Sequence, residues 1–453
     1  MFPEIFFYLS LNQKSMRYCF LLVFALFNIC ESRAQEYSIG GYFEASGWLS
    51  TRDSLPFWGF SNTNNDLSSQ SNFNGILEVN QSLKLKSQAR FNAVASYFLR
   101  DNAVENLQRK ELYVEFENRW LSITVGSKEV QDEFGGLGIV KDNFLLSGNA
   151  RALPGVLITS KSPTKVSEKI AFDWSIAHYE LNDNRFVNGT LVHYKKGGVY
   201  WTPNARNRFY AGLEHVAQWG GVSPIEGRQP TGIGDFIDVF LAREANEEAT
   251  ESDQNNALGN SIGAYIFEYT TSSLSADYKF YWNHPIEDGS GTRLENFPDG
   301  IWGFYYKPKE DNFDFVLDGL IIEYIQTISQ SGGTGTAGRD NYFNNGIYRS
   351  GWTYDGATIG LPIIQVPDNN RVQAINLGID TKFKKINTLF KLTYLRSLGT
   401  FASPLQTNRE SILSFLNLNY GTNYGKFFVE LGYDYINTQN DILGIGFGYS
   451  YKL

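Results

Sequence analysis

Apolar and polar residues alternate most clearly over the last 27 residues of the chain. The period is two from Phe427 to Ile436, and after a polar turn at 437–441 it returns from Leu443 to Leu453. A period of two predicts β-strands, so this stretch predicts a hairpin with one apolar face. In a soluble sandwich that face packs against a second sheet, whereas in an outer-membrane barrel it meets lipid.

Segments of about ten alternating residues recur along the whole chain, and we expect about eighteen strands. The predicted strands are 37–49, 75–86, 88–100, 108–118, 120–126, 156–160, 170–180, 189–200, 208–218, 261–270, 273–282, 300–307, 314–327, 371–382, 386–396, 410–420, 427–436 and 443–453. There is no composition shift or long helical period that indicates a second domain.

Short and long connections alternate between these strands. The short ones are 87, 118–119, 271–272, 307–313, 384–385 and 421–426, and the long ones are 50–74, 127–155, 219–260, 283–299, 328–370 and 397–409. Outer-membrane barrels have short periplasmic turns and long extracellular loops, and a sandwich has no reason for this alternation. The predicted fold class is therefore all-β, a transmembrane antiparallel outer-membrane β-barrel, with both mature termini in the periplasm of a Gram-negative bacterium.

The N-terminus predicts a secretory signal peptide over residues 1–34, with Met16 as the expected start. An apolar run at 18–29 precedes Ser32-Arg33-Ala34, which has small residues at the cleavage positions. The bulky residues before Cys30 argue against a lipoprotein. Residues 35–453 then form a single barrel domain without cysteine, since Cys19 and Cys30 both lie in the signal.

Composition and charge restrict the partners. Aromatic residues make up 15% of the chain and the mean hydropathy is −0.29, which suits strands that alternate between lipid and lumen. The net charge is −9, and it becomes −10 without residues 1–34, which carry three basic and two acidic side chains. An acidic chain disfavours nucleic-acid binding, and we expect no cofactor.

Two of the long connections predict structure of their own. Apolar residues at helical spacing predict a short amphipathic helix over 234–246, packed over the mouth of the barrel. The acidic residues that follow predict either a solvated surface or a divalent-cation bridge to anionic polysaccharide; they are Glu244, Glu247, Glu248, Glu251 and Asp253. The stretch 134–155 is expected to enter the lumen as a partial plug.

Five blocks in the central part of the chain resemble the Wzi-type capsule assembly proteins, in the form seen in Bacteroidetes-like sequences. The blocks are GLEHVAQWGG at 212–221, GNAR at 148–151, ALGN at 257–260, EDGSG at 287–291 with PDG at 298–300, and NYFNNGIY at 341–348 leading into GWTY at 351–354. Unlike some relatives, this chain shows no helical bundle before its first strand. The resemblance implies an outer-membrane lectin that anchors capsular or other surface polysaccharide and supports capsule assembly.

On the predicted topology these blocks meet at the extracellular mouth. A glycan site needs flat aromatic faces for the apolar side of a sugar ring, with amides and carboxylates for its hydroxyl groups. The candidate polysaccharide-binding residues are His215, Gln218, Trp219, His284, Glu287, Asp288, Asn296, Asp299, Tyr342, Asn345, Tyr348, Trp352 and Tyr354. The expected partners besides polysaccharide are outer-membrane lipid, lipopolysaccharide and the barrel assembly machinery.

Other interpretations of the same residues stay open. Barrel Trp and Tyr are commonly interfacial residues, and His215 and His284 are also interpretable as structural side chains. The chain could instead be a sugar-permeable channel. A hydrolase would use His284, Glu287, Asp288 and Ser290, but there is no nucleophile elbow or metal-ligand spacing, so we expect no enzyme.

Overall fold

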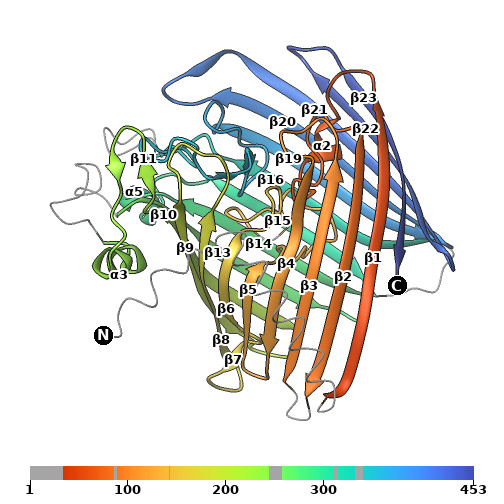
Figure 1. The fold of residues 1–453 in the computed structure, drawn as a ribbon, viewed down its shortest axis with the longest axis horizontal. Coiled ribbons are helices and arrows are strands. Elements are labelled where there is room, and N and C mark those ends of the chain that lie inside the picture. Colours follow the sequence, from red (N-terminus) through yellow and green to blue (C-terminus); the bar gives the residue numbers. More distant parts are fainter. Residues whose placement is uncertain (1–33, 86–88, 142, 244–257, 310–314, 332–339) are drawn as a thin grey trace.

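The strands form one closed antiparallel barrel in the computed structural model, which describes residues 34–85, 89–141, 143–243, 258–309, 315–331 and 340–453 (Figure 1). Successive strands are hydrogen-bonded, and β1 closes the barrel by pairing with β23. The barrel strands are β1 (Ala34–Ser50), β2 (Phe73–Leu85), β3 (Arg90–Arg100), β4 (Leu107–Glu117), β5 (Leu121–Ser127), β6 (Pro154–Ser160), β7 (Thr164–Lys165), β8 (Ile170–Leu181), β9 (Thr190–Trp201), β10 (Asn207–Trp219), β13 (Asn260–Ser272), β14 (Ala276–Ile286), β15 (Gly300–Pro308), β16 (Phe315–Gln326), β19 (Val372–Phe383), β20 (Ile386–Gly399), β21 (Pro404–Thr422), β22 (Gly425–Ile436) and β23 (Ile442–Lys452).

The barrel has eighteen strand positions within the described residues, because β6 and β7 both pair with β8 and share one position. The predicted fold class and strand count are confirmed. The predicted long connection at 397–409 is wrong, since β20 continues to Gly399, β21 begins at Pro404 and Ser397 pairs with Arg409; the connection is 400–403. Polar side chains do not end a strand, because the backbone N–H and C=O groups of neighbouring strands can still pair with one another.

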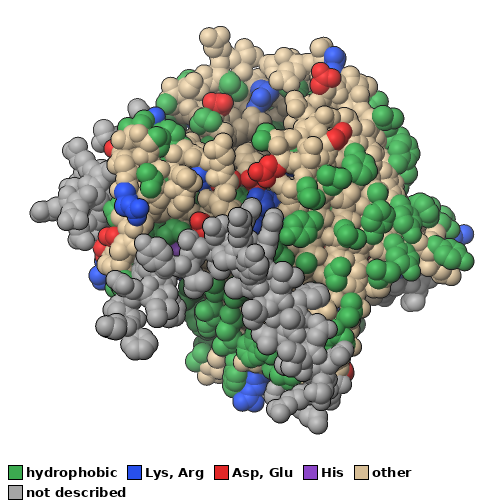
Figure 2. All heavy atoms as spheres, in the orientation of Figure 1, with side chains coloured by type: hydrophobic (Ala, Val, Ile, Leu, Met, Phe, Trp, Pro, Cys, Tyr) green, Lys and Arg blue, Asp and Glu red, His purple; other side chains and the backbone are tan. Residues whose placement is uncertain are grey.

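The outer wall carries the apolar half of the alternation. On β1, the side chains of Ile39, Phe43 and Leu49 are exposed, and the register places Phe43 beside Leu77 of β2 and Tyr451 of β23. Figure 2 shows hydrophobic side chains spread over this wall. Such a continuous apolar surface is stable where lipid covers it. Within the described residues, no helix is both long and apolar enough to span a membrane.

Aromatic rings line the outer wall towards one end of β9, β10, β13 and β14. Trp201 and Phe209 stack with centroids 5.1 Å apart, Phe209 and Tyr269 are 4.7 Å apart, and Phe280 follows at 6.2 Å from Tyr269. Rings of this kind mark the boundary between membrane and water. Short connections such as 202–206 and 273–275 gather at this end, which we call the short-connection end; the opposite end is the long-connection end.

The lumen is filled by long connections that fold inwards. Parts of 55–67, 134–153 and 340–364 pack together and against lumen-facing wall residues such as Ile301 and Ile321; we call this filling the loop core. It also contains α2 (Phe57–Phe60) and the two-stranded β17 (Thr353–Tyr354) and β18 (Ala357–Thr358). The predicted entry of 134–155 into the lumen is confirmed.

The predicted helix exists as α3 (Ile233–Leu241), but its predicted position over the mouth is wrong. Phe236 of α3 contacts the rings of His178, His193 and Trp219, which lie on β8, β9 and β10. Alternate side chains of a strand point to the same side of the wall. By this alternation and the strand pairing, the three residues point outwards, as the exposed Leu213 and Val199 do. The helix therefore packs on the outside of the wall. A small hairpin of β11 (Val222–Ser223) and β12 (Gly227–Arg228) precedes it.

Candidate functional site

The predicted convergence of the family-like blocks occurs at the long-connection end. Gln218 Nε2 donates to the carbonyl oxygen of Gly351 (2.9 Å), and its Oε1 accepts from Asn260. Asn345 also donates to Asn260 (3.2 Å). The Tyr348 hydroxyl donates to the carbonyl oxygen of Gly220 (3.2 Å). The blocks at 212–221 and 341–354 therefore form one hydrogen-bonded unit with Asn260.

The connection between β14 and β15 joins this unit through Tyr342. This connection contains α5 (Gly289–Thr292). Asn296 Nδ2 donates to the Tyr342 hydroxyl (2.7 Å), which itself donates to Asp299 Oδ2 (3.1 Å). Asp299 also accepts the backbone N–H groups of Ser329 and Gln330. Asp299 and Asn296 thus hold connections together, which is a positioning role.

The predicted exposed aromatic surface is not formed. The five candidate rings are at most 3% exposed; they are Trp219, Tyr342, Tyr348, Trp352 and Tyr354. Trp352 Nε1 donates to the carbonyl oxygen of Leu145 (2.8 Å), and the Tyr354 hydroxyl donates to Asn182 (2.5 Å). The rings are buried because they join separate connections into the loop core. In this conformation their faces are covered and cannot stack on a sugar.

The residues proposed for hydrolase chemistry are not arranged as a catalytic set. His284 lies on the outer wall between the rings of Tyr265 and Trp282, and its Nδ1 is 2.9 Å from the carbonyl oxygen of Asp299. Ser290 Oγ donates to Asp288 (2.5 Å), which caps α5. Ser290 Oγ also bonds to Ser331 Oγ (2.9 Å), so the described bonds of this hydroxyl go to Asp288 and Ser331. His215 also faces outwards on β10, paired with Lys195 of β9.

Carboxyl groups in these connections influence one another. Burial, with the nearby charge of Asp340, raises the pKa of Glu287 to about 8, although the N–H of Asn341 donates to this carboxylate and opposes the shift. Burial also raises the pKa of Asp340 to about 6, and Asp288 and Asp299 contribute to that rise. Among the described residues, no group of three or more His, Cys, Asp or Glu side chains is arranged to hold a metal. The acidic run at 244–253 lies outside the described residues.

A cavity of about 330 Å³ lies in the lumen between the loop core and the wall. One side is formed by lumen-facing residues of β1, β2, β20, β21 and β22, and the other by residues of 58–67 and 132–141. The polar lining residues are Glu44, Ser46, Ser61, Asn62, Thr63, Asn64, Asp66, Asn74, Asp132, Lys141, Lys391, Asn417, Asn419, Lys426 and Glu430. Trp58, Phe415 and Phe428 add apolar surface. The cavity therefore combines amide, carboxylate, ammonium and aromatic groups.

Several lining groups are fixed by contacts within the protein. Asn417 Nδ2 donates to Glu430 Oε1 (2.7 Å). Lys391 Nζ donates to the carbonyl oxygen of Gly138 (2.9 Å) and lies 3.5 Å from the centroid of the Trp58 ring. Asp66 pairs with Lys110 of β4. These contacts hold the polar groups in defined positions before any ligand binds.

The cavity was not predicted from the sequence. Its wall residues are the polar half of the strand alternation, as in Asn417 and Asn419 between Leu416, Leu418 and Tyr420. Carboxamides repeated on the lumen face of one strand were the available signal, but every barrel has a polar lumen face. Which polar positions border open space depends on where the loop core lies.

Comparisons with known proteins agree with this architecture. The family model described as "Capsule assembly protein Wzi" matches residues 52–443. Wzi of Escherichia coli, described as an outer-membrane protein involved in group 1 capsule assembly and a carbohydrate-binding β-barrel, has a TM-score of 0.62 at 12% identity, with 96% of this chain and 88% of that chain covered.

Two solved structures from Pseudomonas aeruginosa share the fold at lower similarity. OccK3 (OpdO) has a TM-score of 0.52 at 10% identity, with 94% of this chain and 98% of that chain covered. OprD has a TM-score of 0.51 at 9% identity, with 93% and 94% covered. No curated protein sequence matches the chain. The family model spans most of the sequence, and this outer-membrane β-barrel therefore belongs to the Wzi family of capsule assembly proteins.

Proposed function

We propose that this protein binds capsular or other surface polysaccharide at the outer membrane and holds it during capsule assembly, without catalysing a reaction on it. The long-connection end faces the cell exterior in this proposal, and the termini face the periplasm. Family membership and the carbohydrate-binding description of E. coli Wzi support it. The proposed partners are the polysaccharide, the lipid and lipopolysaccharide around the wall, and the barrel assembly machinery during insertion.

The observation that carries the proposal is the lumen cavity. Its volume is at the lower end of the range of about 300–1,000 Å³ that is typical of ligand sites, which suits a short saccharide unit. Amides and carboxylates such as Asn417, Asn419 and Glu44 match sugar hydroxyl groups, and the partly exposed Phe415 offers apolar surface. We place the primary saccharide contacts here instead of at the buried rings of the rim.

A single site of this kind is weak, because each neutral hydrogen bond contributes only about 0.5–1.5 kcal/mol net. Retention of a polymer then depends on many repeating units that meet many barrels. The acidic residues Glu244, Glu247, Glu248, Glu251 and Asp253 stay candidates for divalent-cation bridging. If chelator leaves polysaccharide binding by the purified barrel unaltered, they have no such role.

The test is a binding measurement with the detergent-solubilised barrel and oligosaccharide fragments of the host strain's own surface polysaccharide. The double variant Asn417→Ala/Asn419→Ala removes two carboxamides from the cavity. We expect its dissociation constant to rise about tenfold, since 1.4 kcal/mol corresponds to a factor of ten.

The matched control is Asn387→Ala. Asn387 pairs directly with Asn419 across β20 and β21 but does not line the cavity. Heat-modifiable migration on gels verifies that both variants form barrels. Unchanged affinity in a folded double variant would place the saccharide elsewhere, and cleavage of the fragments during the assay would contradict binding without catalysis.

A further inference from the structure

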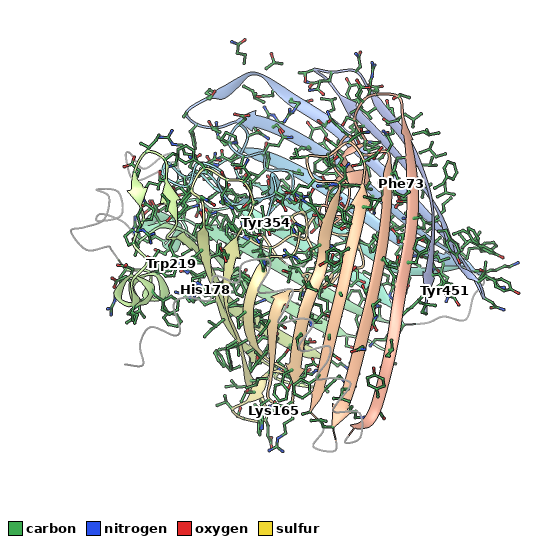
Figure 3. All side chains as sticks on the ribbon, in the orientation of Figure 1. Phe73, Lys165, His178, Trp219, Tyr354 and Tyr451 are labelled. Atoms are coloured by element: carbon green, nitrogen blue, oxygen red, sulfur yellow. The ribbon has the colours of Figure 1, made fainter. Side chains whose placement is uncertain are left out.

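Helix α3 covers a polar area of the outer barrel wall. Its residues Phe236, Val239 and Phe240 face the wall, where Phe236 contacts His178, His193 and Trp219. Figure 3 shows His178 and Trp219 together beside α3. Lys195 of β9 donates to the carbonyl oxygen of Phe240. Without the helix, imidazole rings and an ammonium group would face outwards on a wall that is otherwise apolar.

The helix has two further faces in addition to the wall face. Ile233, Ile237 and Leu241 are spaced four residues apart, so they form one stripe, and each is about half exposed (51%, 48% and 46%). Asp235 and Asp238 lie about 160° and about 100° around the helix from the centre of this stripe, because successive residues turn by about 100°. Asp235 also accepts the N–H of Gly232 and caps the helix. A helix resting on the wall thus presents an apolar stripe on one side and carboxylates on the other.

The position of α3 along the wall matches a membrane boundary. Trp219, which the helix covers, lies ten positions after Phe209, a member of the aromatic row at the short-connection end. A strand rises about 3.3 Å per residue, and barrel strands tilt by about 40°. The two rings are therefore about 25 Å apart along the barrel axis, which equals the usual height of the apolar band.

The lipid-facing surface continues directly up to the helix. Ile176 and Leu213 are exposed and face outwards. Ile176 lies two positions before His178, and Leu213 lies two positions before His215, so each is next to a histidine on the same face of its strand. The stripe of Ile233, Ile237 and Leu241 adds apolar surface where this band ends. In a membrane, acyl chains cover the apolar wall next to the helix. We therefore assign acyl chains as the contact of the apolar stripe as well.

We propose that α3 is an interfacial helix that lies in the membrane plane at the long-connection end. Ile233, Ile237 and Leu241 contact the acyl chains of the surrounding leaflet, and Asp235 and Asp238 face headgroups and water. Amphipathic helices lie in a bilayer interface with an apolar face towards the acyl chains and a charged face towards water. In α3 the charged face carries carboxylates in place of the usual Lys and Arg. The helix thereby lets the wall keep its histidines and Lys195 out of contact with lipid.

The experiment uses single cysteine variants labelled with a nitroxide in the full barrel without residues 1–34, which hold the two cysteines of the chain. The barrel is reconstituted in phosphatidylcholine and phosphatidylglycerol vesicles. Collision rates are measured with oxygen, which enters the bilayer, and with a water-soluble nickel chelate. We expect oxygen to dominate for Ile237→Cys and the nickel chelate to dominate for the adjacent Asp238→Cys.

Leu213→Cys on the open wall is the lipid-facing reference, and heat-modifiable migration verifies that each variant is folded. Nickel accessibility at position 237 equal to that at position 238 would overturn the proposal. Spin–spin broadening at position 237 would also overturn it, because the stripe would then pack against a second copy of the chain. Saccharide binding is not measured, so this result is independent of the proposed function.

Discussion

At the scale of single residues, the aromatic side chains of the long-connection end stabilise the loops. Trp352 joins the connection between β16 and β19 to the connection between β5 and β6 through Leu145, and Tyr354 lies in the interior between Arg109, Arg151 and Asn182 (Figure 3). Trp219 lies under α3 on the opposite side of the wall. Residue types that suit sugar binding are used here for packing.

Replacing Trp352 by Ala therefore tests packing. We expect a loss of about 3–5 kcal/mol in the stability of the loop core, because the change removes a buried indole and its hydrogen bond. The temperature at which heat-modifiable migration is lost should fall. Trp120→Ala is the control, since Trp120 is 60% exposed and contacts Arg119. Equal shifts for the two variants would contradict the packing role.

The burial of Glu287 near Asp340 predicts a dependence of stability on pH. The pKa of Glu287 is raised from 4.5 to about 8, so the folded protein binds more protons than the unfolded chain between these values. Stability must then fall as the pH rises through this window. We expect the thermal unfolding temperature to decrease from pH 5 to pH 8 and to decrease less in Glu287→Gln. The same slope in both proteins would show that Glu287 is not the group responsible.

At the scale of elements, the second long connection is held in the lumen by one wall carboxylate. Glu323 of β16 accepts from the N–H of Ile139 (2.8 Å), the hydroxyl of Tyr281 (2.6 Å) and Nδ2 of Asn376 (2.7 Å). Lys391 holds the adjacent Gly138. The connection is therefore tied to β14, β16, β19 and β20 at once.

Loss of this acceptor should loosen the filling of the lumen. Glu323→Leu removes the acceptor of the Ile139 N–H and of the Tyr281 hydroxyl, which costs about 1–3 kcal/mol for each group. Asn376 Nδ2 keeps its bond to the carbonyl oxygen of Leu137. We expect low conductance of the wild-type barrel in planar bilayers and a higher, fluctuating conductance of the variant. Glu323→Gln keeps an acceptor and serves as the control. A large steady conductance of the wild type would instead support the sugar-permeable channel.

At the scale of the whole molecule, the barrel and the entry of 134–155 into the lumen were predictable from sequence, whereas the contacts inside the lumen were not. Strand alternation is local, so each strand from 37–49 to 443–453 could be recognised by itself. The contact of Ile139 with Glu323 joins residues 184 positions apart, and no periodicity encodes it. The helical spacing of α3 was equally local, whereas its docking depends on His178 and His193 of distant strands. The cavity was hidden for the same reason.

The filling of the lumen is shared between distant parts of the chain. The N–H of Ser147 donates to the carbonyl oxygen of Ile359, and the N–H of Leu361 donates to that of Phe144. The segment around Phe144 and Ser147 therefore lacks these partners until residues 359–361 are present. Sealing of the pore consequently requires both segments, and neither completes it alone.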